Sequence, residues 1–193
     1  MKMNLPNKLT LLRLCLVPVV MLVGFLPSSI IPFYISCFVC AILFIGTAVT
    51  DMLDGQIARK HGLITDFGKF LDPIADKFMV IGAMFIVLYK FPNLRELMIA
   101  ALIIVIFREL AVTSMRLVVS TGEGVVVAAN VLGKVKTVAQ IVCILVLILE
   151  PLVLFFDTLH LAAWAVIAFM GIMTVWSGAS YLKSYISFID PNE

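Results

Sequence analysis

The sequence predicts an all-α, polytopic membrane protein with six transmembrane helices and a short N-terminal interfacial segment. Three observations predict this class: 63% of the 193 residues are hydrophobic, only 13% are charged, and the apolar residues fall into six runs. The mean hydropathy is +1.15. A soluble domain is about half apolar and a quarter charged, whereas a membrane span needs about 20 mostly apolar residues. The composition therefore excludes a soluble globular protein, a disordered chain and a disulfide-stapled secreted domain.

The first apolar run, residues 9–26, follows a capped helix start and ends before a proline. Pro6 with Asn4 and Asn7 is typical of the first turn of a helix, and Pro27 comes directly after the run. Because the run lacks a small-residue cleavage site and more spans follow, we expect a retained helix and not a signal peptide.

Later apolar runs predict the other five helices. They are expected at residues 30–60, 68–88, 97–119, 132–155 and 159–182. The second continues as a helical pattern through charged positions beyond residue 50. Arg108, Glu109 and Arg116 interrupt the fourth, and small residues such as Gly171 and Gly178 suit the sixth to close helix packing. Because linkers and repeats are lacking, we expect a single domain over residues 1–193.

The basic residues predict the orientation. If the N-terminus is cytoplasmic, 12 of the 14 Lys and Arg residues lie on or toward that side, and only Lys90 and Arg95 lie outside. This is a strong positive-inside bias. We therefore expect both termini and the active site in the cytoplasm, and the lack of a transit segment favours a bacterial plasma membrane.

Four aspartates stand out because charge within an apolar helix costs several kcal/mol. Asp51 and Asp54 share one helix face, and Asp72 and Asp76 share a face of the next helix. A short connection would make these helices antiparallel neighbours, so all four carboxylates can meet at the cytoplasmic end. Such hard oxygen ligands favour Mg²⁺ or Mn²⁺ over Zn²⁺, and four of them suit two ions. The alternative is a set of helix caps and ion pairs with Arg59, Lys69 and Lys77.

Small residues lie between the aspartates. Gly55, Ala58 and Gly68 would let a planar base or a pyrophosphate approach the backbone, and Arg59 could hold a phosphate oxygen. Each small residue could instead serve helix packing.

Together these residues resemble the signature of the CDP-alcohol phosphatidyltransferase family. The pattern is Asp51-x2-Asp54-Gly55-x2-Ala58-Arg59-x8-Gly68-x3-Asp72-x3-Asp76, and all eight fixed positions match. The resemblance implies six spans and a cytoplasmic N-terminus. It implies that Asp51, Asp54 and Asp72 hold metal, and that Asp76 lies near metal and acts as the general base. It also implies a CDP-linked lipid donor, with Gly55, Ala58, Arg59 and Gly68 around the cytidine nucleotide, and a homodimer.

The remaining polar residues bear on the acceptor. Cationic and polar groups near the cytoplasmic ends of the spans suit a phosphate monoester, which carries close to two negative charges. These groups are Thr10, Arg13, Arg108, Arg116, Lys134 and Lys136. They resemble the branch of the family whose acceptor is sn-glycerol 3-phosphate, which implies phosphatidylglycerol phosphate and CMP as products. The alternative is that these residues merely anchor helices against lipid headgroups.

Other functions remain open at this point. An inositol-phosphate or cardiolipin-forming branch of the family is the main rival, and a divalent-cation transporter would also place carboxylates in helices. We expect membrane lipid but no nucleic acid among the partners. His61 and His160 are isolated. Four aromatic residues in or beyond the last span are interpreted as packing groups and interfacial anchors: Trp164, Trp176, Tyr181 and Tyr185.

Overall fold

The chain is all-helical throughout the part that the computed structural model describes, which comprises residues 4–62, 65–121, 131–153 and 160–185. One 3₁₀ turn, Pro92–Leu94, precedes the fourth helix. The α-helices are α1 (Leu5–Phe25), α2 (Phe33–His61), α3 (Asp66–Lys90), α4 (Arg95–Thr121), α5 (Val131–Val153) and α6 (Leu161–Tyr185). The predicted all-α class is confirmed, and each helix lies within a few residues of its expected range.

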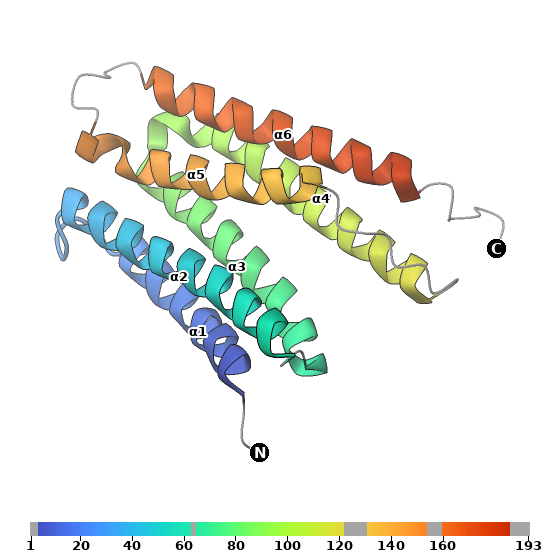
Figure 1. The fold of residues 1–193 in the computed structure, drawn as a ribbon. Helices are drawn as coiled ribbons and strands as arrows, with labels where there is room; N and C mark the ends of the chain where they lie inside the picture. Colours follow the sequence, from blue (N-terminus) through green and yellow to red (C-terminus); the bar gives the residue numbers. More distant parts are fainter. Residues whose placement is uncertain (1–3, 63–64, 122–130, 154–159, 186–193) are drawn as a thin grey trace.

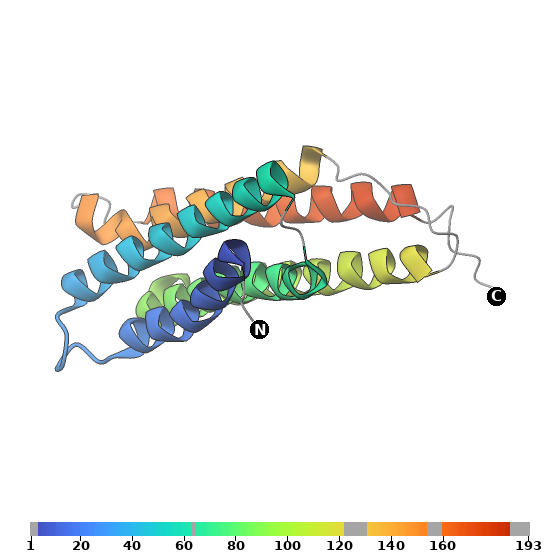
Figure 2. The ribbon, with the colours of Figure 1, turned by 60° about the horizontal axis from the view of Figure 1, so that its bottom comes forward.

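The six helices form two layers of three, as Figures 1 and 2 show. One layer contains α1, α3 and α4, and the other contains α2, α5 and α6. Contacts between α1 and α2 and between α4 and α6 join the layers at their two edges. The aspartate-bearing helices α2 and α3 touch each other at few positions, because α1 packs against both of them. Thus α1 stands between two helices that we expected to be direct neighbours.

Five of these helices are long and apolar enough to cross a membrane, and α3 is the remaining one. The first part of α3 contains Asp72, Asp76 and Lys77, which interrupt its apolar sequence. A sixth span therefore stays a prediction. Because α1 begins at Leu5 and continues to Phe25 without a break, residues 4–25 do not contain the separate interfacial segment that we expected.

Polar caps fix the helix ends that surround the aspartates. Asn4 caps α1 by accepting a hydrogen bond from the Asn7 backbone N–H, as its sequence position predicts. Gly62 ends α2 with a φ of +63°, a left-handed conformation that glycine adopts without a steric penalty. Thr65 then caps α3 by accepting from the Gly68 N–H at 3.1 Å. The last two caps define where α2 ends and where α3 begins.

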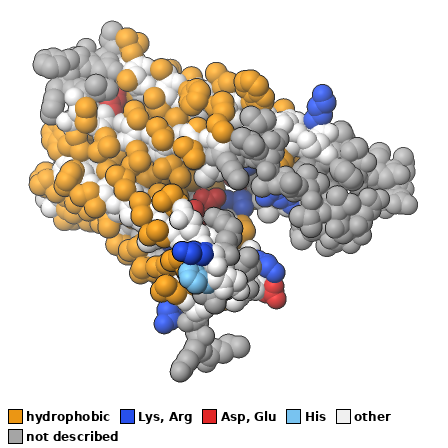
Figure 3. Space-filling view, viewed as in Figure 1, with side chains coloured by type: hydrophobic (Ala, Val, Ile, Leu, Met, Phe, Trp, Pro, Cys, Tyr) orange, Lys and Arg blue, Asp and Glu red, His pale blue; other side chains and the backbone are white. Residues whose placement is uncertain are grey.

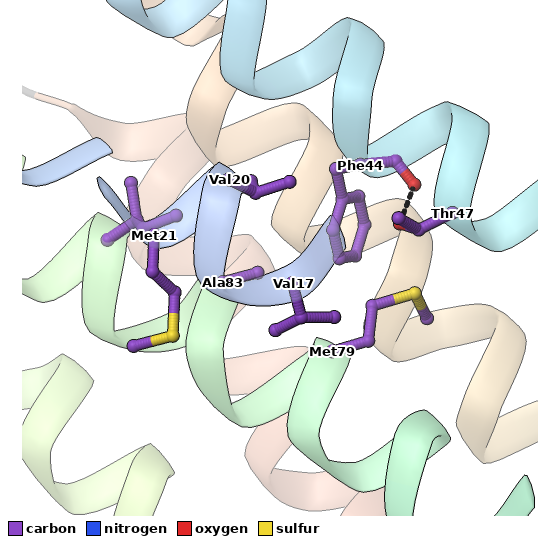
Figure 4. A pocket seen from close by; sticks show the side chains of 8 residues that line it. Val17, Val20, Met21, Phe44, Thr47, Met79 and Ala83 are labelled. Atoms are coloured by element: carbon purple, nitrogen blue, oxygen red, sulfur yellow. Dashed lines mark hydrogen bonds between the residues drawn. The ribbon is translucent and has the colours of Figure 1, made fainter. Parts of the chain in front are cut away.

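An apolar core holds α1, α2 and α3 together, as Figure 4 shows. Val17 and Val20 of α1 meet Phe44 of α2 and Met79 of α3, and all four side chains are buried. A Cβ added to Gly82 would lie 3.0 Å from the Met21 Sδ, so glycine permits the close approach of α1 and α3. This packing fixes the positions of the polar residues further along the same helices.

Polar and apolar side chains are distributed as expected for a protein surrounded by lipid. Large apolar side chains such as Leu22 and Phe107 are exposed, whereas charged side chains such as Arg13 and Lys136 are buried. Figure 3 shows a mostly apolar face on which acidic and basic side chains meet at a central hollow. The buried charges are therefore the residues that require a functional explanation.

Candidate active site

Arg13 joins the two aspartates of α2. Its guanidinium forms ion pairs with Asp51 and Asp54, and its side chain has no exposed surface. Because α1 packs directly on α2, the α1 residue reaches both carboxylates at once. Its positive charge compensates two carboxylates that lie one helical turn apart.

Thr10, one turn before Arg13, links Asp54 of α2 to Asp72 of α3. Its hydroxyl lies 2.8 Å from Asp72 Oδ1 and 3.4 Å from Asp54 Oδ2, and it also lies within hydrogen-bond distance of the Pro6 carbonyl. A hydroxyl has a single proton, so it donates to one of these oxygens at a time. Thr10 and Arg13 therefore draw Asp51, Asp54 and Asp72 toward one side of α1.

The chemistry of this donor set fits a hard divalent cation. The converging groups are carboxylate oxygens, which suit Mg²⁺ or Mn²⁺. As placed, no three acidic, histidine or cysteine side chains in the described ranges form a group that could hold an ion. Arg13 instead supplies positive charge between Asp51 and Asp54. The residue types thus fit a metal, but in this structure the spacing of Asp51 and Asp54 is set by their ion pairs with Arg13.

A narrow cavity of about 160 Å³ lies between α1, α2 and the start of α3. Gly55, Ala58 and Gly68 line it, so three of the four residues predicted around the nucleotide come together. Its other walls come from Asn7, Thr10, Asp54, Thr65 and Asp72, together with Pro6 and Lys69. The side chain of Arg59, the fourth predicted residue, lies outside the described part of the structure.

One wall of the narrow cavity is held by a polar contact between α1 and the N-cap of α3. Thr65 donates from its hydroxyl to Asn7 Oδ1 at 2.9 Å. A Cβ at Gly68 would lie 3.1 Å from the same Asn7 oxygen and 3.3 Å from the Thr65 hydroxyl. Glycine at this position therefore keeps the space open without disturbing the Asn7–Thr65 hydrogen bond.

A wide cavity of about 630 Å³ lies on the other side of the aspartates. Asp51, Asp72 and Asp76 line one part of its wall, and Arg108, Arg116 and Lys136 line another. Asp72 lines both cavities. Acidic and cationic groups therefore face one space, in which an anionic molecule could lie with a hydroxyl directed at a carboxylate.

The cations of the wide cavity are fixed by contacts between α4, α5 and α6. Glu109 forms ion pairs with Lys136 and, at 3.2 Å, with Arg108. Arg108 also donates to the Ser177 hydroxyl at 2.8 Å, and Arg116 donates to the Tyr181 hydroxyl at 3.0 Å. One acidic residue thus neutralises part of the charge, and the three cations retain a net positive charge toward the cavity.

The structure divides the residues that were predicted to bind the acceptor phosphate into two groups. Arg108, Arg116 and Lys136 come together in the wide cavity, whereas Thr10 and Arg13 contact the aspartates instead. The side chain of Lys134 is outside the described residues. The Asp76 carboxylate lines the wide cavity and accepts no hydrogen bond from any residue in the described ranges.

Several residues of the site could not be assigned from the sequence. Asn7 and Thr65 pair across 58 positions, and Tyr181 contacts arginines of another helix, so no local pattern indicates either contact. Tyr181 is buried, which agrees with the packing role that we predicted for the aromatic residues of the last span and not with that of an interfacial anchor. The one available signal in the sequence is Gly133, which directly precedes Lys134.

Comparisons with known proteins agree with the sequence signature. Residues 3–176 match the family model described as CDP-alcohol phosphatidyltransferase. A Bacillus subtilis (strain 168) protein named CDP-diacylglycerol–glycerol-3-phosphate 3-phosphatidyltransferase is 43% identical over 192 residues, which cover 93% of this chain and 94% of that protein. Proteins of the same name from Yersinia pestis (strain Pestoides F) and Escherichia coli (strain K12) are each 35% identical, over 95% of this chain and 96% of theirs.

Proposed function

Because the chain belongs to the CDP-alcohol phosphatidyltransferase family, we propose that it transfers the phosphatidyl group from CDP-diacylglycerol to sn-glycerol 3-phosphate. The products are phosphatidylglycerol phosphate and CMP. The observation that carries this acceptor is the wide cavity, in which Asp76 shares one space with Arg108, Arg116 and Lys136. The names of the relatives point to the same acceptor.

The wide cavity suits glycerol 3-phosphate because this molecule has a dianionic phosphate at one end and a primary hydroxyl at the other. Arg108, Arg116 and Lys136 bind the phosphate, since arginine and lysine form charge-assisted hydrogen bonds with phosphate oxygens. The hydroxyl is then directed toward Asp76, which accepts its proton. An uncharged acceptor would leave the positive charge that remains after the Glu109 ion pairs without a counterion, so the cavity also selects against it.

The donor nucleotide is assigned to the narrow cavity. Gly55, Ala58 and Gly68 leave room for the cytidine diphosphate beside Asp54 and Asp72, and Arg59 is proposed to hold a phosphate oxygen. Asp51, Asp54, Asp72 and Asp76 are the residues that would hold divalent cations, and two such ions would neutralise the pyrophosphate charge when bound. The acceptor oxygen attacks the phosphorus that carries diacylglycerol, the bond to CMP breaks, and CMP leaves.

We also propose a membrane arrangement for this reaction. The sixth span is α3, and both termini and the aspartates lie on the cytoplasmic side, where the positive-inside distribution places them. A soluble acceptor and a lipid donor can meet only at such an interface. The protein is proposed to be a homodimer in a bacterial plasma membrane. Light scattering of the detergent-solubilised protein would test the homodimer.

The general-base role is tested by Asp76→Asn in detergent with Mg²⁺ or Mn²⁺. Release of CMP should fall to background while the elution profile and melting temperature stay near those of the parent. Asp66→Asn is the matched control, because Asp66 is an exposed residue in the first turn of the same helix. Substantial residual turnover in Asp76→Asn would contradict the role of this residue.

The acceptor is tested separately. The parent protein, supplied with CDP-diacylglycerol, should release CMP with glycerol 3-phosphate and not with an inositol phosphate or phosphatidylglycerol. Arg116→Ala should raise the KM for glycerol 3-phosphate more than the KM for CDP-diacylglycerol. An equal rise in both KM values would argue against a dedicated acceptor cavity.

A further inference from the structure

We propose that Tyr181 is a positioning residue that holds Arg108 and Arg116 in place for the acceptor phosphate. This inference rests on the proposed function, since it assigns a role within the same wide cavity. Tyr181 belongs to α6, whereas both arginines belong to α4. It acts through the two guanidinium groups, and no contact between Tyr181 and the substrate is required.

Tyr181 contacts both arginines by two kinds of interaction. Its ring centroid lies 5.4 Å from the Arg108 Cζ and 5.2 Å from the Arg116 Cζ, which are distances of cation–π contacts. Its hydroxyl also accepts a hydrogen bond from Arg116 Nη2 at 3.0 Å. One buried aromatic side chain, only 3% exposed, thus contacts two like charges.

The hydroxyl end of the Tyr181 ring also packs against Gly133 of α5. A Cβ added to Gly133 would lie 2.6 Å from the Tyr181 hydroxyl oxygen and 3.3 to 3.4 Å from two ring carbons. Only a glycine leaves room for the ring here, so the α5 backbone at Gly133 lies directly against the Tyr181 ring. The hydroxyl end of Tyr181 is therefore confined by α5 as well as by Arg116.

Two further α6 residues, which precede Tyr181 by about one turn, complete the support for Arg108. Ser177 accepts from Arg108 Nη2 at 2.8 Å, and a Cβ at Gly178 would lie 3.1 Å from the Arg108 Cγ. The stem of Arg108 therefore crosses α6 where a side chain is absent. Arg108 is held at its stem by α6, at Nη1 by Glu109, at Nη2 by Ser177 and at its guanidinium by the Tyr181 ring, so its orientation is largely determined before a ligand binds.

This arrangement matters because two neighbouring guanidinium groups repel each other until an anion binds between them. An aromatic ring attracts both cations through its negative face, and it does so without neutralising them as a carboxylate would. Tyr181 thus keeps the two arginines together and still available to a dianionic phosphate. Binding then requires less reorganisation of the side chains, which favours a low KM for the acceptor.

The test compares Tyr181→Leu with Tyr181→Phe in the detergent-solubilised full-length protein. Tyr181→Leu removes the ring and the hydroxyl and should raise the KM for glycerol 3-phosphate about tenfold. Tyr181→Phe keeps the ring and should raise it by only about threefold. In both variants, kcat and the KM for CDP-diacylglycerol should change by less than about twofold. Trp176→Leu is the matched control, because Trp176 is an exposed aromatic residue of the same helix.

Gly133→Ala gives an independent test that leaves Tyr181 unchanged. The added methyl should displace the Tyr181 hydroxyl and raise the KM for glycerol 3-phosphate. The rise should be smaller when Gly133→Ala is introduced into Tyr181→Phe, where the closest clashing atom is absent. If Tyr181→Leu does not fold, Tyr181→Phe and Gly133→Ala still decide between the outcomes.

The outcomes separate this inference from the proposed function. If the parent releases CMP with glycerol 3-phosphate but the Tyr181 variants change only kcat, or change both KM values equally, the positioning role is overturned and the proposed function stands. If the parent shows no release that depends on glycerol 3-phosphate, the proposed function itself fails. A rise in the KM for glycerol 3-phosphate alone that is large in Tyr181→Leu and small in Tyr181→Phe supports the inference.

Discussion

Thr10 of α1 and Asp72 of α3 lie within 2.8 Å of each other, although 62 positions separate them in the chain. The same hydroxyl is 3.4 Å from Asp54 of α2. A single neutral side chain therefore lies between carboxylates of two helices that otherwise touch at few positions. The first helix is thus part of the site as well as a membrane span.

The Thr10 hydroxyl should be required for full activity. Thr10→Val keeps the size and branching of the side chain but removes the donor, and hydrogen bonds to charged groups contribute about 1.5–3 kcal/mol. We expect kcat/KM for CMP release to fall by about 10- to 100-fold, and Thr10→Ser to recover most of the loss. Thr50→Val is the control, because the Thr50 hydroxyl contacts only backbone carbonyls of α2. Equal effects at the two positions would contradict a specific role for Thr10.

Arg13 should contribute to stability more than an ordinary cation. Arg13→Ala leaves Asp51 and the buried Asp54 without their partner, and breaking a buried ion pair costs about 3 to 5 kcal/mol. The melting temperature in detergent should therefore fall, and excess Mg²⁺ should raise it more in the variant than in the parent because the aspartates lack a countercharge. Arg13→Lys should be intermediate, since an ammonium group cannot engage two carboxylates as a guanidinium does.

Arg95→Ala is the control for Arg13, because Arg95 is an exposed arginine at the start of α4. Its melting temperature should match the parent within error. If Arg13→Ala and Arg95→Ala melt alike, the ion pairs of Arg13 do not stabilise the fold.

Gly68 should determine the affinity for the donor. Gly68→Ala adds a methyl 3.1 Å from Asn7 Oδ1, inside the narrow cavity. Adding one carbon to a fitted pocket changes binding by about tenfold or more, so the KM for CDP-diacylglycerol should rise while that for glycerol 3-phosphate changes little. Gly46→Ala is matched to it, because a Cβ at Gly46 meets nothing within 4 Å. An unchanged donor KM in Gly68→Ala would remove the nucleotide from this cavity.

Removal of divalent cations should abolish transfer. The predicted ligands are carboxylate oxygens, which prefer Mg²⁺ and Mn²⁺. After treatment with EDTA, release of CMP should fall to background, and added Mg²⁺ or Mn²⁺ should restore it. Ca²⁺ serves as a comparison, because it is larger than Mg²⁺ and its coordination geometry is less rigid. Full activity in excess EDTA would show that the aspartates work without a metal.

Much of the fold and part of the site follow from local sequence patterns. The spacing of Asp51 with Asp54, and of Asp72 with Asp76, reflects the helical repeat, and apolar runs of about 20 residues predict helices whatever their partners. The narrow cavity also follows, since Gly55, Ala58 and Gly68 belong to the same motif as the aspartates. These features depend on contacts within about 25 positions.

The other features depend on which helices pack together, and loop length does not determine this. Arg13 was grouped with the acceptor cations because its charge has the right sign. Its actual partners, Asp51 and Asp54, depend on the packing of α1 against α2. Likewise, Tyr181 is an amphipathic residue near the end of α6, where an interfacial anchor would lie, yet the packing of α4 on α6 buries it beside two arginines. Amphipathic aromatic residues suit both surroundings.

The position of Asp72, in the wall shared by the narrow and wide cavities, has a kinetic consequence. With the proposed assignment of the donor to the narrow cavity and the acceptor to the wide cavity, both substrates can lie beside this carboxylate at the same time, so neither has to depart before the other arrives. Steady-state data at several fixed concentrations of one substrate should then give intersecting double-reciprocal lines. Release of CMP should also require the acceptor, so CDP-diacylglycerol would not be consumed in the absence of glycerol 3-phosphate.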